Sequence, residues 1–292
     1  MRPGWPTWPT WDERIERARV LADEYPFATE ILIFYSKLTA FQKASYAYFQ
    51  SIFSAQPLPK GGLQHLLDPN ALLPRFRPFL SMVACEAPPA LARFACDLEK
   101  QGANAWLQSL TGFWSLAGDP ARREPEPSGV DSFSRFCAQA FLQPYAEYLV
   151  HRAGPPELVA RRSRCPFCAA LPLVGVLRRE GDGAKKSLLC SLCRTEWDYP
   201  RIACPACEEY REDRLCVYTA QRFEYVRVEA CETCRSYLKT IDLTKNGLAV
   251  PEVDDLASIP LTLWAEDKGY EDRRQLSRSL INQWSISAGL QE

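Results

Sequence analysis

The chain has 292 residues, of which 47% are hydrophobic and 24% are charged, and its formal net charge at pH 7 is −1. This balance excludes an intrinsically disordered chain, and no apolar run approaches the roughly 20 residues that a membrane-spanning helix needs. A net charge near zero also weighs against binding to nucleic acid through bulk electrostatics. The N-terminal sequence lacks the apolar core of a secretory signal, so we expect a cytoplasmic protein with no membrane partner.

The first half of the chain has the apolar periodicity of helices. Ile15, Ala18 and Ala22, for example, follow helical spacing behind an acidic first turn at Asp12 and Glu13. The expected helices lie at about 12–22, 26–53, 69–83, 89–98, 103–116 and 132–150. We therefore predict a bundle of five to seven helices that serves as a scaffold.

Short segments of strand character follow Gly154-Pro155-Pro156. The expected strands are 171–178 and 185–189 around the turn signal Gly181-Asp182-Gly183, then 215–219, 223–228 and a run from Tyr237 to Ile241. From Val253 the pattern becomes helical again, and Pro260 should kink or restart that helix. We expect four regions: a helical domain (1–157), two small cysteine-rich modules (158–200 and 201–250) and a C-terminal helical segment (251–292).

Cysteine is the unusual component of the composition. Eight of the 12 cysteines form four Cys-x-x-Cys pairs, which are separated by 21, 10 and 23 residues. Joining the first pair to the second and the third to the fourth gives two patterns close to that of a four-cysteine metal site. The pairs are Cys165/Cys168, Cys190/Cys193, Cys204/Cys207 and Cys231/Cys234. Both histidines lie outside this region, so any metal there would be held by thiolates alone.

The two cysteine modules are copies of one pattern, since CPFC and CPAC open them and CSLCRT and CETCRS close them. A unit of about 30 residues normally needs a metal or a disulfide to fold, and a reducing cytosol favours the metal. Four thiolates suit zinc and iron equally, so the ligands do not distinguish the two metals. We predict two tetrahedral ions per chain, iron or zinc.

The turns of such modules often place glycine directly after the second cysteine of a pair. Here that position holds Ala169, Arg194, Glu208 or Arg235, so non-glycine residues must adopt the turn. A lone CPFC would also resemble the dithiol of thioredoxin-like oxidoreductases. No helix of a βαβ unit follows this pair, which makes dithiol catalysis the lesser hypothesis.

Several other residues are expected to be structural. Cys85, Cys96 and Cys137 fall at helical core positions, and Cys216 is expected to face the core from a strand. Asp254 and Asp255 are adjacent, so on a helix they would point about 100° apart. We expect them to be capping and surface groups rather than a catalytic pair, and we expect no enzyme active site.

The ordered set of motifs resembles the formate dehydrogenase accessory protein family FdhE. The resemblance lies in CPFCAALPLVGVLRREGDGAKKSLLCSLCRTEWDYPRIACPAC, then CETCRSYLKTIDL, then VDDLASIPLTLWAEDKGY, and covers about residues 160–272. Two positions depart from the family pattern: Asp198 stands where histidine is frequent, and Ala169 where glycine is common.

The resemblance implies a fold and a function. The fold would be a helical domain joined to two tandem rubredoxin-like or zinc-ribbon modules and a C-terminal helix. The function would be that of a cytoplasmic maturation factor that binds the catalytic subunit of a formate dehydrogenase and supports its assembly or activation.

Two alternatives remain open at this point. A zinc-ribbon nucleic-acid-binding protein would need a basic surface, which Arg161, Arg162, Arg164, Arg178, Arg179, Lys185 and Lys186 would form if they converged. An iron-dependent electron-transfer protein acting on the same partner would use the cysteine sites for redox chemistry.

Overall fold

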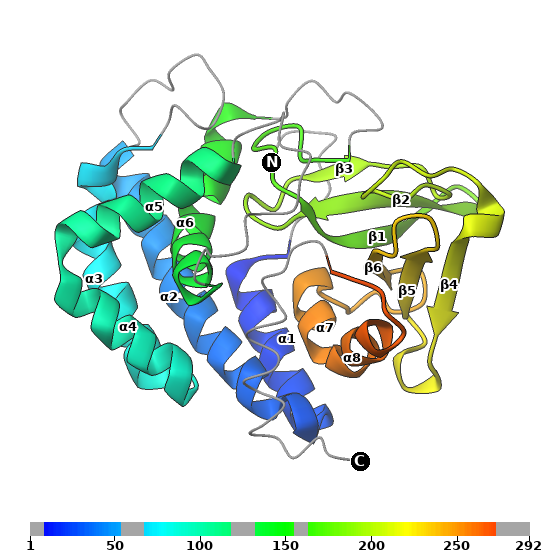
Figure 1. The fold of residues 1–292 in the computed structure, drawn as a ribbon, viewed down its shortest axis with the longest axis horizontal. Helices are drawn as coiled ribbons and strands as arrows, with labels where there is room; N and C mark the ends of the chain where they lie inside the picture. Colours follow the sequence, from blue (N-terminus) through cyan, green and yellow to red (C-terminus); the bar gives the residue numbers. More distant parts are fainter. Residues whose placement is uncertain (1–8, 54–66, 118–131, 155–162, 273–292) are drawn as a thin grey trace.

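The computed structural model describes residues 9–53, 67–117, 132–154 and 163–272. Its first half is a bundle on one side of the molecule (Figure 1). The α-helices there are α1 (Trp11–Glu24), α2 (Thr29–Phe53), α3 (Pro69–Glu86), α4 (Pro89–Gln101), α5 (Ala103–Ala117) and α6 (Ser132–Ala153), with a short 3-10 turn at Pro26–Ala28 between α1 and α2. The predicted helical bundle is confirmed.

Helix α6 is the central helix of this bundle. Almost every residue from Cys137 to Val150 is buried, so this part of the helix has no solvent-exposed face. Phe141 of α6 packs edge-on against Phe76 of α3, with ring centroids 4.8 Å apart. Helix α1 begins with a capping box, in which the side chain of Thr10 accepts from the backbone of Glu13 and the Glu13 carboxylate accepts from the backbone of Thr10.

The cysteine-rich half forms one six-stranded sheet with the order β3-β2-β1-β6-β5-β4. The strands are β1 (Pro172–Glu180), β2 (Gly183–Cys190), β3 (Glu196–Asp198), β4 (Leu215–Thr219), β5 (Val226–Cys231) and β6 (Tyr237–Asp242). Both predicted hairpins are present, β1 with β2 and β4 with β5. The predicted combination of a helical bundle with two small β modules is therefore confirmed.

A short parallel pairing between β1 and β6 joins the two modules, and the sequence did not predict it. Gly175 pairs with Thr240, Val176 with Ile241 and Leu177 with Asp242, whereas every other strand pair in the sheet is antiparallel. The modules therefore share one continuous sheet rather than folding as two separate β units.

Two helices follow the sheet and lie between it and α1 (Figure 1). Helix α7 spans Pro251–Ala257 and α8 spans Ile259–Asp267, with Pro260 in the first turn of α8, so the predicted restart is confirmed. The carboxylate of Asp254 caps α7 by accepting from the Val250 amide at 2.7 Å. Asp254 and Asp255 are nevertheless buried, which corrects the prediction that they are surface groups.

Buried ion pairs explain that correction. Asp254 pairs with Arg17 of α1, with the Nη2–Oδ1 distance at 2.5 Å, and Asp255 pairs with the buried Lys239 of β6 at 3.0 Å. Arg14 of α1 likewise joins Glu147 of α6 and Glu252 of α7, each at 2.9 Å. Buried charges of this kind are tolerated only in pairs, so they fix how the bundle, α7 and the sheet are joined.

Gly175 is required by the junction between the modules. A Cβ added at Gly175 would lie 2.3 Å from Oγ1 of Thr240, a fully buried side chain on the neighbouring strand. We expect Gly175→Ala to lower the free energy of unfolding by about 1–3 kcal/mol through overpacking. Urea unfolding of the two proteins side by side measures the difference.

Gly183→Ala is the matched control, because the nearest atom to its added Cβ is a carbonyl oxygen at 3.9 Å. We also expect the double variant Gly175→Ala/Thr240→Ala to recover part of the loss, since it removes the clashing hydroxyl. Equal stability of Gly175→Ala and the wild type would show that β1 and β6 are not packed as described.

Candidate metal centres

The structure brings the eight paired cysteines together as two groups of four, in the predicted combination. One group is Cys165, Cys168, Cys190 and Cys193, and the other is Cys204, Cys207, Cys231 and Cys234; within each group the sulfur atoms all lie within 4.8 Å of one another. The first group joins the start of β1 to the end of β2. The second joins the turn before β4 to the turn between β5 and β6. We call them site 1 and site 2.

The spacing of the sulfur atoms fits a tetrahedral metal ion. Metal–sulfur bonds of about 2.3 Å would place the corners of a tetrahedron about 3.8 Å apart. In site 1 the Sγ–Sγ distances are 3.5 Å for Cys165–Cys193 and 3.3 Å for Cys168–Cys190. In site 2, Cys204–Cys234 is 3.7 Å and Cys207–Cys231 is 3.6 Å. Each group of four thiols could therefore hold one metal ion.

Each Cys-x-x-Cys pair lies in a tight turn whose backbone geometry repeats. The amide of Cys165 donates to the Ala170 carbonyl, and the amide of Ala169 donates back to the Cys165 carbonyl. Cys204 and Glu208 repeat this pattern with Glu209, as do Cys231 and Arg235 with Ser236. The turns are thus built by the backbone, and they place the two sulfurs of each pair on the same side.

The residue after each pair adopts a left-handed backbone conformation, as the lack of glycine required. The φ angles are 58° at Ala169, 59° at Arg194, 60° at Glu208 and 56° at Arg235, and among the described residues no other non-glycine residue has a positive φ. A side chain in this conformation costs roughly 1–2 kcal/mol. The strained residue stands at the same position in all four turns. The geometry of the cysteine pair therefore requires the left-handed conformation at that position.

Hydrogen bonds to sulfur prepare the thiols for a thiolate state. Cys165 accepts from the Phe167 amide at 3.4 Å, and Cys204 accepts from the Ala206 amide at the same distance. One hydroxyl group also lies beside the last cysteine of each site. Thr195 Oγ1 is 3.1 Å from Cys193 Sγ, and Ser236 Oγ is 3.0 Å from Cys234 Sγ.

Thr195 and Ser236 were not predicted as site residues, although the repeat contains them. They are the final residues of CSLCRT and CETCRS, so they stand at equivalent places in the two modules. A hydroxyl residue two positions after the last cysteine of both copies was the signal that could have identified them.

Burial makes a metal ion necessary if all four thiols of site 1 are to ionise. Desolvation raises the pKa of Cys168 and of Cys193 well above the ordinary value for a thiol. Four close-packed sulfurs in a low-dielectric interior cannot all carry a negative charge without a cation. A bound metal would supply that cation, and it would displace the thiol protons.

The other cysteines lie outside both groups. Cys137 is buried as predicted, but Cys85 is exposed and Cys96 is only partly buried, which corrects their assignment to the core. They lie on outer faces of α3 and α4 because each of those helices has only one buried side. Cys216 is also partly buried, so it does not face the core fully as expected.

Three of the described basic residues of the first module are paired with carboxylates. Arg178 makes a bidentate pair with Glu196, Lys185 pairs with Asp198, and Lys186 is buried beside Glu229. Arg164 donates to the Ala169 carbonyl at 3.1 Å, and Arg179 is exposed. Arg161 and Arg162 lie outside the described residues. Because carboxylates neutralise three of these side chains, the geometry offers little support for the nucleic-acid-binding alternative.

The helices of the described residues include none that is long and apolar enough to cross a membrane.

Comparison with known proteins agrees with this arrangement. Residues 164–201 match the sequence model of the FdhE central domain, and residues 202–277 match that of the FdhE C-terminal domain. The chain is 27% identical over 269 residues to a protein named Protein FdhE homolog from Aquifex aeolicus (strain VF5), a match that covers 88% of this chain and 90% of the relative. A protein of the same name from Pectobacterium carotovorum subsp. carotovorum (strain PC1) is 27% identical over 277 residues, or 92% and 85% of the two chains.

A solved structure shares the fold. The crystal structure of the FdhE protein from Pseudomonas aeruginosa matches with a TM-score of 0.61 at 24% identity, over 91% of this chain and 94% of that one. The resemblance to the FdhE family that the cysteine pairs and their neighbouring motifs predicted is confirmed.

The left-handed turn positions offer a test of the site geometry. Glu208 is exposed, and no hydrogen bond or ion pair of its carboxylate is seen among the described residues. We expect Glu208→Gly to raise the free energy of unfolding by about 1 kcal/mol, because glycine adopts a φ of 60° without strain. Glu208→Ala is the control, since it removes the same carboxylate and keeps the Cβ. A gain for alanine equal to that for glycine would show that charge, not backbone strain, is responsible.

Proposed function

From its likeness to the FdhE family, we propose that this chain is a metal-binding accessory protein of a formate dehydrogenase. It binds the catalytic subunit of that enzyme in the cytoplasm and supports assembly or activation rather than catalysing a reaction itself. The observation that carries this proposal is the ordered pair of four-cysteine sites within residues 164–277, the region that matches both FdhE domains.

We propose that both sites hold a metal ion, iron or zinc. Cys165, Cys168, Cys190 and Cys193 are the ligands of site 1, and Cys204, Cys207, Cys231 and Cys234 are those of site 2. The support is geometric, since the sulfur separations fit a tetrahedron and amide groups donate to the sulfurs. The metal would act as the cross-link that each small module needs in order to fold.

The proposed division of the chain follows from this. The helical domain, residues 1–157, is a scaffold on which the modules at 158–200 and 201–250 are mounted, and the segment from 251 onward joins the two through α7 and α8. The buried pairs of Arg14 with Glu147 and Glu252 support this role, because they connect α1, α6 and α7.

Metal analysis of the purified chain tests the ligand assignment. We expect two iron or zinc ions per chain by elemental mass spectrometry, and one ion in either Cys168→Ser or Cys207→Ser, because a tetrahedral site binds weakly after losing one ligand. Cys85→Ser is the matched control: Cys85 is exposed and belongs to neither group, so its loss should leave two ions. Two ions in Cys168→Ser would contradict the assignment of site 1.

The partner is tested by capture from the source cells. We expect the tagged chain, expressed under conditions that induce formate dehydrogenase, to retain the catalytic subunit of that enzyme, identified by mass spectrometry. Reciprocal capture with a tagged catalytic subunit should retain this chain, and the tag alone should retain neither. Absence of the subunit from the captured material, with its presence in the extract confirmed, would contradict the proposal.

A further inference from the structure

We infer that the two cysteine sites are unequal: site 2 exchanges its metal with solutes, whereas site 1 holds its metal as a permanent structural centre. This inference rests on the metal binding proposed above, and it adds a division of roles between the two sites. It follows from how differently two copies of one motif are covered by the rest of the chain.

The exposure of the sulfur-bearing residues differs first. In site 1 all four cysteines are buried, and none has more than 3% of its surface exposed. In site 2, Cys204 and Cys231 are buried, but Cys207 is exposed and Cys234 is partly exposed. An incoming ligand can therefore reach a metal in site 2 from the Cys207 side, and it has no comparable approach to site 1.

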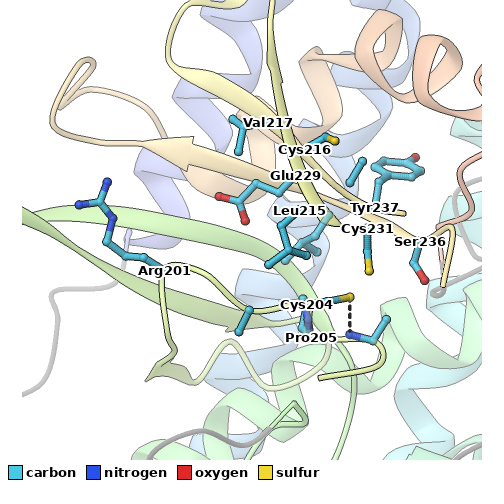
Figure 2. Close-up of a pocket in the computed structure, with 14 residues that line it drawn as sticks. Arg201, Cys204, Pro205, Leu215, Cys216, Val217, Glu229, Cys231, Ser236 and Tyr237 are labelled. Carbon is cyan, nitrogen blue, oxygen red and sulfur yellow. Dashed lines mark hydrogen bonds between the residues drawn. The ribbon is translucent and has the colours of Figure 1, made fainter. Parts of the chain in front are cut away.

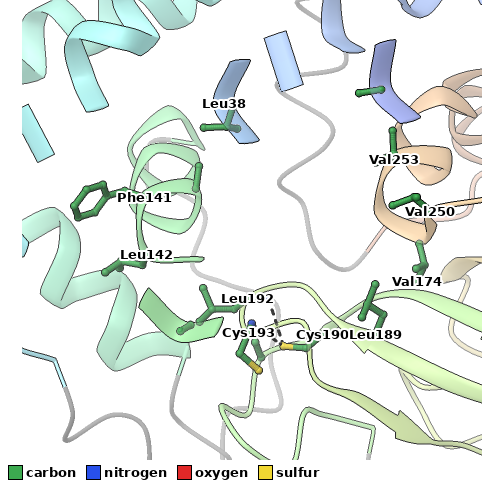
Figure 3. Close-up of a cluster of buried hydrophobic side chains, with 14 of the residues drawn as sticks. Leu38, Phe141, Leu142, Val174, Leu189, Cys190, Leu192, Cys193, Val250 and Val253 are labelled. Atoms are coloured by element: carbon green, nitrogen blue, oxygen red, sulfur yellow. Dashed lines mark hydrogen bonds between the residues drawn. The ribbon is translucent and has the colours of Figure 1, made fainter. Parts of the chain in front are cut away.

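The repeat shows which residues cause the difference. Between the last two cysteines of site 1 lies Leu192, which is 1% exposed and belongs to the hydrophobic core (Figure 3). Thr233 takes its place in site 2 and is exposed. Between the first two cysteines, Phe167 packs against the core in site 1, and its counterpart in site 2 is the small Ala206. Two large apolar side chains beside site 1 are thus replaced by a polar and a small side chain beside site 2; we call these four residues the covering residues.

The first site is also tied to the helical bundle. Gln139 and Gln143 of α6 both donate to the carbonyl of Ser191, at 3.1 and 3.0 Å. Nε of Arg194, in the same turn, lies 3.9 Å from the carboxylate of the buried Glu147. Opening site 1 would break these contacts and expose Leu192, so release of its metal is coupled to loss of packing between the sheet and α6.

The second site is held by Tyr199, whose hydroxyl donates to the Cys204 carbonyl at 3.1 Å, and by the segment that follows α8. The chain after α8 lies along its last turn, where Glu271 accepts from the Tyr237 amide at 3.1 Å and donates to the Arg235 carbonyl at 2.8 Å. These backbone contacts fix the turn but leave Cys207 uncovered. On another side, a surface pocket is lined by Cys204 and Cys231 together with Glu229 and Val217 (Figure 2). Because Cys204 and Cys231 are themselves buried, the approach to the centre is from the Cys207 side.

The exchange step needs no oxidant or reductant. An incoming soft ligand forms a bond to the metal, the bond between the metal and Cys207 Sγ breaks, and the thiolate is released into water, where it takes up a proton. The bonds from the metal to the remaining three thiolates then break one after another, and each released thiolate takes up a proton while a new ligand takes its place on the metal. The metal keeps its charge throughout, since only ligands and protons move.

Zinc release from the full-length chain tests this inference. The chain is loaded with zinc, its content is confirmed as two ions, and a chromogenic pyridylazo chelator is added in excess. We expect two phases of one zinc ion each, with the fast phase roughly tenfold faster, which corresponds to a barrier difference of about 1.4 kcal/mol.

Alkylation with iodoacetamide during the fast phase, followed by peptide mapping, should label the cysteines of site 2 and spare those of site 1. Cys85 and Cys96 are internal controls, because they lie in the helical bundle and their labelling should not depend on the chelator.

Exchanging the covering residues between the two sites provides matched variants. Ala206→Phe/Thr233→Leu should slow the fast phase, and Phe167→Ala/Leu192→Thr should speed the slow phase. If either variant fails to fold, the labelling map of the wild type decides the question alone. Two zinc ions released in a single phase, or fast labelling of site 1, would overturn the inference and leave the proposed metal binding intact. A chain that binds fewer than two zinc ions would overturn both.

Discussion

The short parallel pairing of β1 with β6 is the contact on which the cysteine-rich half depends. Each module on its own is a small hairpin with two cysteine turns, and such a unit buries too little surface to be stable without further support. Three paired residues in each strand combine the modules into a six-stranded sheet, with β1 and β6 at its centre. Val176 and Ile241, paired across that junction, are both fully buried, so the junction is also the core of the sheet.

The helical bundle is attached to this sheet through charge as well as apolar packing. Arg14 and Arg17 lie on one helix, α1, and reach carboxylates on α6 and α7. A buried charge that loses its partner typically costs 3–5 kcal/mol, so these pairs penalise any other docking of the two halves. Apolar contacts alone would tolerate sliding, whereas a set of directional ion pairs specifies one arrangement.

Local signals in the sequence predicted the elements and the cysteine grouping, but not how the two modules associate. Turn residues such as Gly181 and the spacing of the Cys-x-x-Cys pairs are local, and hairpins and cysteine turns form from neighbours in the chain. The β1–β6 pairing joins residues about 65 positions apart, such as Gly175 and Thr240. The apolar periodicity of a strand does not indicate which distant strand it pairs with. The burial of Asp254 and Asp255 was not predicted either, because their partners, Arg17 on α1 and Lys239 on β6, belong to other elements that only the fold brings close.

The parallel direction of β1 and β6 also determines where the two cysteine sites, and the charge of their thiolates, lie. Site 1 is built at the start of β1 and site 2 at the start of β6, so both sites lie at the same end of this strand pair. Each divalent ion that enters a four-cysteine site displaces up to four thiol protons, which leaves that site about two charges more negative. Metal loading would therefore make the net charge of the chain more negative, and the added negative charge would lie at one end of the sheet. The loaded form would present a more negative surface to a partner or an ion-exchange resin than the nearly neutral metal-free form, although their sequences are identical.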